Sequence, residues 1–292
     1  MAINFIAEIG SNHNQEWSRL EALIRKAKEI GCWGVKLQLF KADELFSEEF
    51  TRKIDAMKKW QLPREFVDPA IELCNELEIK IGFSVFDFDS LEFLSLTAAS
   101  RPAVFLKIGS YEMLWTKFVK AVIDTRLPWM FSTGFSNTND VYDVFRMGEE
   151  ASNFPSVIFH CNSSYPAKPE DCCMDFIRQL SSLTFYSPTS SGWSDHTVSP
   201  LVLLQAVKAG ARFIEFHFDL EDGIGHESSI GHCWSPSKIA YAMALSASIK
   251  NYHNHKLHCR LADDVKWMTD PEDGKRPLKK YREELLAAET KG

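Results

Sequence analysis

Lysine and glutamine side chains alternate with apolar residues in two short runs of this chain. Lys36 and Gln38 lie within the run 35–39, and Lys107 lies within the run 104–109. Because successive side chains of a β-strand point to opposite faces, the apolar residues share one face and these polar groups the other. Two ammonium groups beside an amide form a cationic floor that suits a phosphate or a carboxylate substrate.

Carboxylates, imidazoles and a hydroxyl are expected on the same inward face in other runs. These residues are Glu8, His160, Ser194, His196, Glu215 and His217. A single inward lysine or histidine is more often a satisfied structural group than a functional one. Burying so many polar groups without a function would cost roughly several kcal/mol for each. We therefore interpret this face as a functional centre.

Two of these histidines are candidate metal ligands. His196 and His217 lie near the ends of the seventh and eighth runs, so neighbouring strands would bring them together. Two neutral imidazoles with water and a carboxylate suit Mn²⁺, Fe²⁺, Co²⁺ or Zn²⁺, and they leave positions open for substrate oxygens. A pair of hydrogen-bonded core histidines explains the same spacing equally well, so both interpretations stay open at this point.

Eight strand-like runs carry these residues, with a mean spacing of about 30 residues, the length of one βα unit. They begin near Ile3, Gly34, Ile81, Val104, Trp129, Val157, Ser190 and Phe213. Between the first two runs, apolar residues recur at helical spacing from Leu20 to Ile30. We expect a capping box of Ser18 and Glu21 to begin this helix and Gly31 to end it.

Strands that alternate with helices define an α/β protein, either a closed (β/α)8 TIM barrel or an open doubly wound sheet. The barrel is favoured because no G-x-G-x-x-G or G-x-x-x-x-G-K-[ST] motif follows an early strand. The polar residues lie late in their strands, where the catalytic groups of such barrels gather. We expect a catalytic barrel over residues 1–250, with an insertion at 51–62, and a C-terminal helix and tail over residues 251–292.

Composition excludes several classes of protein. The 33 Lys and Arg against 40 Asp and Glu give a net charge of −7, which argues against nucleic acid as a partner. No apolar run approaches the roughly 20 residues that cross a bilayer, so no membrane is expected. The seven cysteines form no C-x-x-C pair, and the first five residues lack the charged start of a signal peptide. We therefore expect a cytoplasmic protein.

Seven motifs in this order resemble those of the sialic acid synthase family, the N-acetylneuraminate synthases and their bacterial relatives. They are Ala7–His13, Val35–Gln38, Lys107–Glu112, Phe131–Gly134, His160–Pro166, Gly192–Thr197 and Ile214–Phe218. Any one of them is a weak signal, whereas seven in order are highly specific. The resemblance spans residues 3–240.

The resemblance implies a metal-dependent condensation of phosphoenolpyruvate with an acyclic amino-sugar aldehyde such as N-acetylmannosamine. Phosphate is released, and the product is a nine-carbon 2-keto acid. The positions matching His196 and His217 hold a Mn²⁺-like ion in that family. The matching positions that contact phosphoenolpyruvate are Lys36, Gln38, Lys107, Ser132, Ser163 and Ser194. Those that line the site or act in it as carboxylates are Glu8, Glu112, Tyr165 and Glu215.

The chain departs from the family pattern in two places near the last strand. Phe216 replaces a usual lysine, and by alternation it faces the helices, so we expect a change in packing rather than in catalysis. The segment Gly225–His232 replaces the usual Gly-Pro-Asp-His loop, and Glu227 is assigned to the aspartate that holds the sugar. This loop is expected to select the sugar.

The last part of the chain carries three further expectations. The basic run Lys275–Arg282 lies where many relatives begin a C-terminal antifreeze-like domain, which we expect to be missing. His253, His255 and His258 resemble a metal-binding tract, although surface histidines on a final helix are commoner. A homodimer is expected because oligomers most often use twofold symmetry.

Two other functions compete with the leading one. The first is a related phosphoenolpyruvate-dependent synthase or aldolase that acts on another aldose. The second is a non-catalytic sugar-binding homologue, which loss of a lysine or of a metal-binding histidine would favour. Both lysines and both histidines are present, so the enzyme is preferred.

Overall fold

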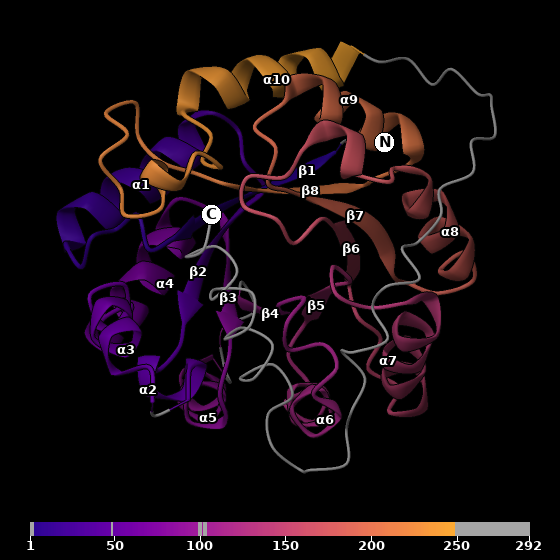
Figure 1. Ribbon diagram of the computed structural model, residues 1–292, viewed down its shortest axis with the longest axis horizontal. Coiled ribbons are helices and arrows are strands. Elements are labelled where there is room, and N and C mark those ends of the chain that lie inside the picture. Colours follow the sequence, from indigo (N-terminus) through magenta and orange to yellow (C-terminus); the bar gives the residue numbers. More distant parts are fainter. Residues whose placement is uncertain (1–2, 48, 99–100, 102–103, 249–292) are drawn as a thin grey trace.

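Eight parallel strands close into a barrel in the computed structural model, which describes residues 3–47, 49–98, 101 and 104–248. Each strand pairs with its neighbours in chain order, and the eighth pairs with the first (Figure 1). The strands are β1 (Asn4–Gly10), β2 (Gly34–Leu39), β3 (Lys80–Val85), β4 (Val104–Ile108), β5 (Trp129–Ser132), β6 (Val157–Cys161), β7 (Ser190–Asp195) and β8 (Phe213–His217). This topology confirms the predicted (β/α)8 TIM barrel.

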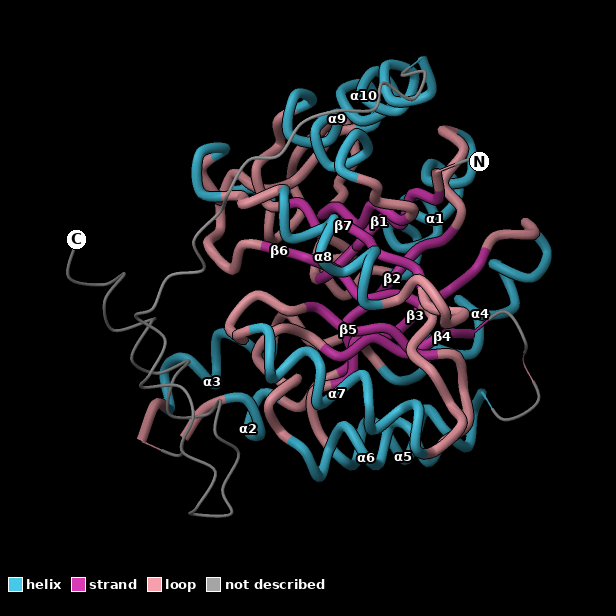
Figure 2. The backbone as a smooth tube through the Cα atoms, turned by 90° about the vertical axis from the view of Figure 1, so that its right-hand side faces the viewer, coloured by secondary structure: helices cyan, strands magenta, loops and turns pink. Residues whose placement is uncertain are grey.

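Helices surround the barrel on its outside, as Figures 1 and 2 show. They are α1 (Trp17–Glu29), α2 (Ala42–Leu45), α3 (Thr51–Lys58), α4 (Val67–Glu76), α5 (Phe88–Ala98), α6 (Thr116–Asp124), α7 (Thr138–Glu150), α8 (Asp175–Leu183), α9 (Pro200–Ala209) and α10 (Pro236–Ser248). The described residues also form three 3₁₀ turns in the connections: η1 (Arg64–Phe66), η2 (Pro169–Asp171) and η3 (Ser228–Ile230). Within the described ranges, no helix has the length and apolarity needed to span a bilayer.

The first helix ends as predicted but begins differently. Gly31 follows its last turn with φ +88°, a left-handed conformation that glycine adopts at little cost. The predicted capping box of Ser18 and Glu21 is wrong, because α1 begins at Trp17 and its N-cap position is Glu16. The backbone N–H of Leu20 already donates to the carbonyl of Glu16. Ser18 therefore lies inside the first turn and cannot cap it.

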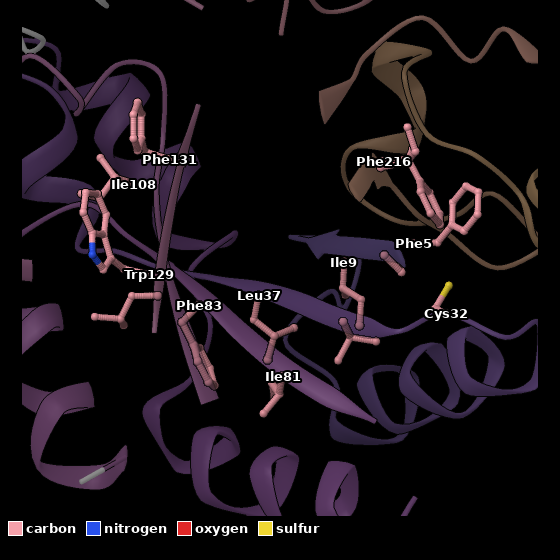
Figure 3. Packing of buried hydrophobic residues seen from close by; sticks show 14 of the residues in the cluster. Phe5, Ile9, Cys32, Leu37, Ile81, Phe83, Ile108, Trp129, Phe131 and Phe216 are labelled. Carbon is pink, nitrogen blue, oxygen red and sulfur yellow. The ribbon is translucent and has the colours of Figure 1, made fainter. Parts of the chain in front are cut away.

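Apolar side chains on the outer face of the strands pack against the helices and form the main core (Figure 3). Leu37, Ile81 and Phe83 contribute from β2 and β3, and all three are fully buried. Phe216 of β8 belongs to the same cluster, which confirms that this departure from the family pattern faces the helices. Burying a side chain of this size stabilises the fold by about 1.5–3 kcal/mol.

A second apolar layer fills the inside of the barrel toward the amino ends of the strands. It consists of Ile6, Phe105, Met130, Val157 and Phe159. Glycines on neighbouring strands leave room for the two rings, because a Cβ at Gly82 would lie 2.1 Å from the ring of Phe105. Each member precedes a second inward position by two residues along its strand, so this layer supports the polar groups above it.

The predicted insertion after β2 forms its own apolar cluster. α2 and α3 bury Leu45, Phe46 and Ile54 against one another, and Met57 and Trp60 pack at the edge of the cluster. The insertion therefore presents an apolar wall at the open end of the barrel. The predicted C-terminal helix and tail, including the three histidines at 253, 255 and 258, lie outside the described residues.

Candidate active site

A cavity of about 250 Å³ opens at the carboxyl ends of the strands. All the predicted site residues except Ser163 and His160 line this cavity. They are Glu8, Lys36, Gln38, Lys107, Glu112, Ser132, Tyr165, Ser194, His196, Glu215, His217 and Glu227. Eight of them come together because they fall on the inward face of their strands: Glu8, Lys36, Gln38, Lys107, Ser132, Ser194, Glu215 and His217. Glu112, Tyr165, His196 and Glu227 instead lie on the loops that follow β4, β6, β7 and β8.

The first lysine of the cavity floor is held by two neighbouring strands. Lys36 Nζ forms an ion pair with Glu8 of β1, which lies opposite it in the strand register. It also donates to Ser84 Oγ of β3 at 2.5 Å. Ser84 was not among the predicted site residues. It occupies the inward position two residues after Gly82, so the alternation of side chains along the strand could have identified it.

The second lysine reaches across the barrel to a carboxylate of β8. Lys107 Nζ lies 3.3 Å from Glu215 Oε1 and donates to Ser132 Oγ at 2.7 Å. Ser194 Oγ of β7 donates to the same carboxylate oxygen at 3.0 Å. Lys36 Nζ lies 3.8 Å from Glu215 Oε2, so this carboxylate lies between the two lysines. The expected cationic floor is therefore balanced by Glu8 and Glu215.

Burial changes the acidity of these groups. It lowers the pKa of Lys36 to about 8, a shift that Glu215 opposes and Lys107 reinforces. Burial alone would raise the pKa of Glu215, but the charges of Lys107 and Lys36 lower it below its ordinary value. Glu215 is therefore an anion at neutral pH, and one floor ammonium is easier to deprotonate than an exposed lysine.

The sequence prediction for the sixth strand is wrong by one residue. His160 was expected to face inward, but Val157 and Phe159 take the inward face and Cys161 lines the cavity. His160 instead packs outside the strand, where its Nε2 lies 2.8 Å from the carbonyl of Cys172. Two bulky apolar residues fill the barrel interior at this strand, so the histidine belongs to the outer core.

The two histidines predicted as metal ligands do converge. The ring centroids of His196 and His217 lie 5.4 Å apart, and both side chains are buried. His196 Nδ1 lies 2.6 Å from the carbonyl oxygen of Asn162, an acceptor, so this nitrogen carries the proton. Burial and the nearby imidazoles lower the pKa of both histidines. Both are therefore neutral at pH 7, the form that binds metals.

The loop after β8 adds a carboxylate to this pair. Glu227 Oε2 accepts from His217 Nδ1 at 2.6 Å, and Glu227 Oε1 accepts from the backbone N–H of Ser11 at 2.8 Å. Burial alone would raise the pKa of Glu227, but contact with His217 and His232 lowers it. The carboxylate is therefore an anion beside a histidine.

His232, which ends the same loop, was not among the predicted site residues. It is buried, and its ring centroid lies 4.4 Å from that of His217. A loop residue fifteen positions beyond a strand gives no periodic signal, so sequence alternation could not place it. Only the general ability of histidine to bind metal ions could have indicated His232 as a site residue.

The remaining predicted residues line the cavity, with the exception of Ser163. Tyr165 packs against His196 with ring centroids 4.0 Å apart and the ring planes tilted by 31°. Glu112 is fully buried within the wall. Ser163 is not a lining residue, but its hydroxyl is 3.1 Å from that of Ser110, a cavity residue that was not among the predicted ones.

The donors around the histidines fit a divalent cation. His196 and His217 offer neutral imidazole nitrogens, and Glu227 offers carboxylate oxygen, a mixture that suits Mn²⁺, Fe²⁺, Co²⁺ or Zn²⁺. His232 adds a buried Nδ1 that has no hydrogen-bond partner among the described residues. These potential metal ligands lie in the same cavity as the charged floor.

The fold and the cavity define the class of (β/α)8 barrels with a charged centre at the carboxyl ends of the strands. Residues 23–240 match the NeuB family. The N-acetylneuraminate-9-phosphate synthase of Drosophila melanogaster is 31% identical over 270 residues, which cover 86% of this chain and 68% of that protein. The chain belongs to the NeuB family.

Other relatives share the same barrel. The spore coat polysaccharide biosynthesis protein SpsE of Bacillus subtilis is 30% identical over 230 residues, and the match spans 75% of this chain and 60% of that protein. Its crystal structure superposes with a TM-score of 0.72 over 83% of this chain and 66% of the other. The N-acetylneuraminic acid synthetase structure from Leptospira borgpetersenii, at 21% identity and a TM-score of 0.76, supports the fold alone.

Proposed function

We propose that this chain condenses phosphoenolpyruvate with an N-acetylated hexosamine aldehyde to give a nine-carbon 2-keto acid and phosphate. The observation that carries the proposal is the pair of buried lysines, Lys36 and Lys107, beside the histidines of the same cavity in a NeuB-family barrel. The lysines suit an anionic substrate, and the histidines suit a cation that binds oxygen.

The phosphoenolpyruvate end is assigned to the floor. Lys107 and Ser132 already share a hydrogen bond there, and Lys36 lies on the other side of Glu215. Both ammonium groups stabilise the negative charge that grows on phosphate as its bond to C2 breaks, in a site that needs little reorganisation. We assign Gln38, Ser163 and Ser194 to the same substrate because the family resemblance implies it.

The chemistry requires a nucleophilic carbon, a water molecule and a leaving phosphate. C3 of phosphoenolpyruvate forms a bond to the aldehyde carbon, whose oxygen takes up a proton and becomes a hydroxyl group. Water then adds to C2 and loses one proton, which balances the proton taken up by the aldehyde oxygen. The C2–O bond to phosphate breaks, and the new C2 hydroxyl gives its proton to the departing phosphate to leave the keto group. Glu112, buried in the cavity wall, accepts the proton of this water. Glu8 and Glu215 hold the lysines in place.

We assign a Mn²⁺-type cation to His196 and His217. When bound, a divalent cation polarises the aldehyde oxygen and orients the sugar. Tyr165 covers His196 and packs against the edge of His217, so it closes this part of the cavity from one side.

The acceptor is proposed to be an uncharged, acylated sugar. Phe40, Leu45, Met57, Trp60 and Ile230 form an apolar wall at the cavity, and such a wall suits the methyl group of an acetamido substituent. Among the described residues that line the cavity, the positively charged side chains of lysine or arginine are those of Lys36 and Lys107, and both lie at the floor. A sugar 6-phosphate would therefore lack a cation partner at the far end of the cavity.

Two further properties belong to this proposal. We propose a homodimer, since closed twofold assemblies are the commonest in proteins of this kind. A cytoplasmic location is proposed from the seven cysteines, because the six that the structure describes are free and four of these are buried.

A phosphate-release assay tests the proposed function. The full chain is incubated with phosphoenolpyruvate and Mn²⁺ and with N-acetylmannosamine, its 6-phosphate or a diacetamido sugar in turn. We expect release that requires an acceptor, matches the amount of 2-keto acid formed and favours an uncharged sugar. Pyruvate-dependent aldol addition without phosphate release would identify an aldolase instead. The proposal would be contradicted if none of these acceptors were turned over and the protein also failed to bind phosphoenolpyruvate.

A further inference from the structure

The loop Gly225–His232 is anchored over the cavity by an asparagine of the β1–α1 connection. Glu227 donates its backbone N–H to Asn12 Oδ1 at 2.8 Å. Asn12 Nδ2 donates in turn to the carbonyl of Phe218 at 3.0 Å. A Cβ at Gly225 would lie 2.3 Å from Asn12 Oδ1, so only glycine fits this close approach. Both contacts fix the backbone beside Glu227.

A buried ion pair fixes the other side of the loop. Asp219 accepts from the N–H of Gly225 at 2.8 Å and from Ser228 Oγ at 2.5 Å. The guanidinium of Arg19 lies 2.5 Å from the same aspartate, and both side chains are buried. Burying charged groups costs desolvation free energy that only close pairing and hydrogen bonding offset. The loop is therefore built to hold Glu227 and His232 in set positions.

Three potential metal ligands meet where this loop faces β8. The ligand atoms of His217, Glu227 and His232 all lie within 4.8 Å of one another, and the three side chains are buried. His232 Nε2 lies 3.7 Å from Glu227 Oε2. His232 Nδ1 has no partner among the described residues, and leaving such a buried group unpaired costs about 1–3 kcal/mol. The histidine is placed for a ligand that the protein alone does not supply.

The spacing of the rings suits a shared ion. A nitrogen–metal bond of about 2.1 Å puts a ring centroid roughly 3.2 Å from the ion, so two neighbouring rings would lie roughly 4.5–5.5 Å apart. The centroids of His217 and His232 are 4.4 Å apart, and those of His196 and His217 are 5.4 Å apart. His196 and His232 are farther from each other, at 6.5 Å, so His217 is the ring that both others approach.

Hydrogen bonds also determine which nitrogen of His217 is available. A carboxylate only accepts hydrogen bonds, so the 2.6 Å contact with Glu227 requires a proton on His217 Nδ1. The lone pair is then on Nε2. A carboxylate that orients a metal-binding histidine in this way raises its basicity as a ligand. Glu227 is thereby committed to His217 and to the backbone of Ser11.

We propose that His232 is a ligand of the divalent cation that His217 holds, and that Glu227 orients His217 for this cation rather than binding the sugar. The inference rests on the proposed cation of the functional assignment. It extends the pair predicted from sequence by a loop residue that lies outside the seven recognised motifs. Glu227 acts as a positioning residue, since it reaches the cation through His217.

Metal binding without substrates tests this inference on the full chain. Metal-free protein is titrated with Mn²⁺ and the free ion is followed by electron paramagnetic resonance, and Co²⁺ absorption bands report the ligand field. We expect one equivalent bound by the unchanged protein. His232→Ala should weaken binding at least tenfold and change the Co²⁺ spectrum, and His232→Gln provides a second variant if the first does not fold. Glu227→Gln should weaken binding about 10–100-fold.

His226→Ala is the matched control, because this histidine lies in the same loop and stacks on Trp60 instead of facing His217. It should bind Mn²⁺ as the unchanged protein does. Equal affinity and an equal Co²⁺ spectrum for folded His232→Ala would overturn the inference while leaving the cation of the proposed function intact. No binding by the unchanged protein would overturn both, so the two failures are distinguishable.

Discussion

Lys107 and Glu215 lie on β4 and β8, four strands apart in the barrel, and their charged groups are 3.3 Å from each other. Lys36 approaches the other oxygen of the same carboxylate at 3.8 Å. The carboxylate of Glu215 therefore lies between two ammonium groups at the floor of the cavity and offsets their mutual repulsion. An anionic substrate bound here must compete with this carboxylate for the lysines.

Replacing the shared carboxylate should destabilise the protein without substrate. Glu215→Gln leaves two buried ammonium groups with one carboxylate, Glu8, and breaking a buried ion pair costs about 3–5 kcal/mol. We expect a lower melting temperature that phosphoenolpyruvate partly restores, together with tighter binding of this anion. Differential scanning fluorimetry measures the first effect and calorimetry the second. Glu72→Gln, at an exposed position of α4, is the control and should change neither.

Lys107 should govern the affinity for phosphoenolpyruvate and leave that for the sugar little changed. A hydrogen bond to a charged group contributes about 1.5–3 kcal/mol, so Lys107→Met should raise the dissociation constant about tenfold to a hundredfold. Isothermal titration calorimetry without acceptor measures it. Lys120→Met changes an exposed lysine of α6 and should bind normally. If Lys107→Met bound phosphoenolpyruvate with unchanged affinity, the assignment of this substrate to the floor of the cavity would be wrong.

The pH dependence should report Lys36. Burial lowers its pKa from the ordinary 10.5 to about 8. The ammonium form binds phosphate, and its fraction falls as the pH rises through this pKa. We expect kcat/KM for phosphoenolpyruvate to fall about tenfold per pH unit above pH 8, because this ratio follows the free enzyme. A ratio that stays constant to pH 10 would show that Lys36 is not needed as a cation.

Strand alternation predicted the fold and the floor of the site because both depend on a period of two residues. Glu8, Lys36 and Lys107 were placed correctly for this reason. The same rule misplaced His160, since nothing in its strand shows whether the interior holds the histidine or a bulky apolar ring. His232 could not be placed, because the shape of its loop is set by hydrogen bonds that the loop backbone donates to Asn12 and Asp219.

The apolar wall should contribute to acceptor binding alone. Trp60 lines the cavity from the end of the insertion after β2 and stacks on His226 with ring centroids 5.7 Å apart. Trp60→Ala removes apolar area that would cover an acyl group, so KM for the sugar should rise severalfold while KM for phosphoenolpyruvate stays constant. Steady-state kinetics with each substrate varied in turn separates these effects. Tyr186→Ala, at a position 98% exposed, is the control.

The most direct test of the proposed reaction follows one oxygen atom. Phosphoenolpyruvate labelled with ¹⁸O at the oxygen that bridges C2 and phosphorus is turned over with an N-acetylated sugar, and both products are analysed by mass spectrometry. Addition of water to C2 followed by loss of phosphate breaks the C–O bond, so the label should appear in phosphate and be absent from the keto group of the sugar acid. Label retained in the keto group or in pyruvate would mean that the P–O bond breaks, which contradicts the condensation proposed for this barrel.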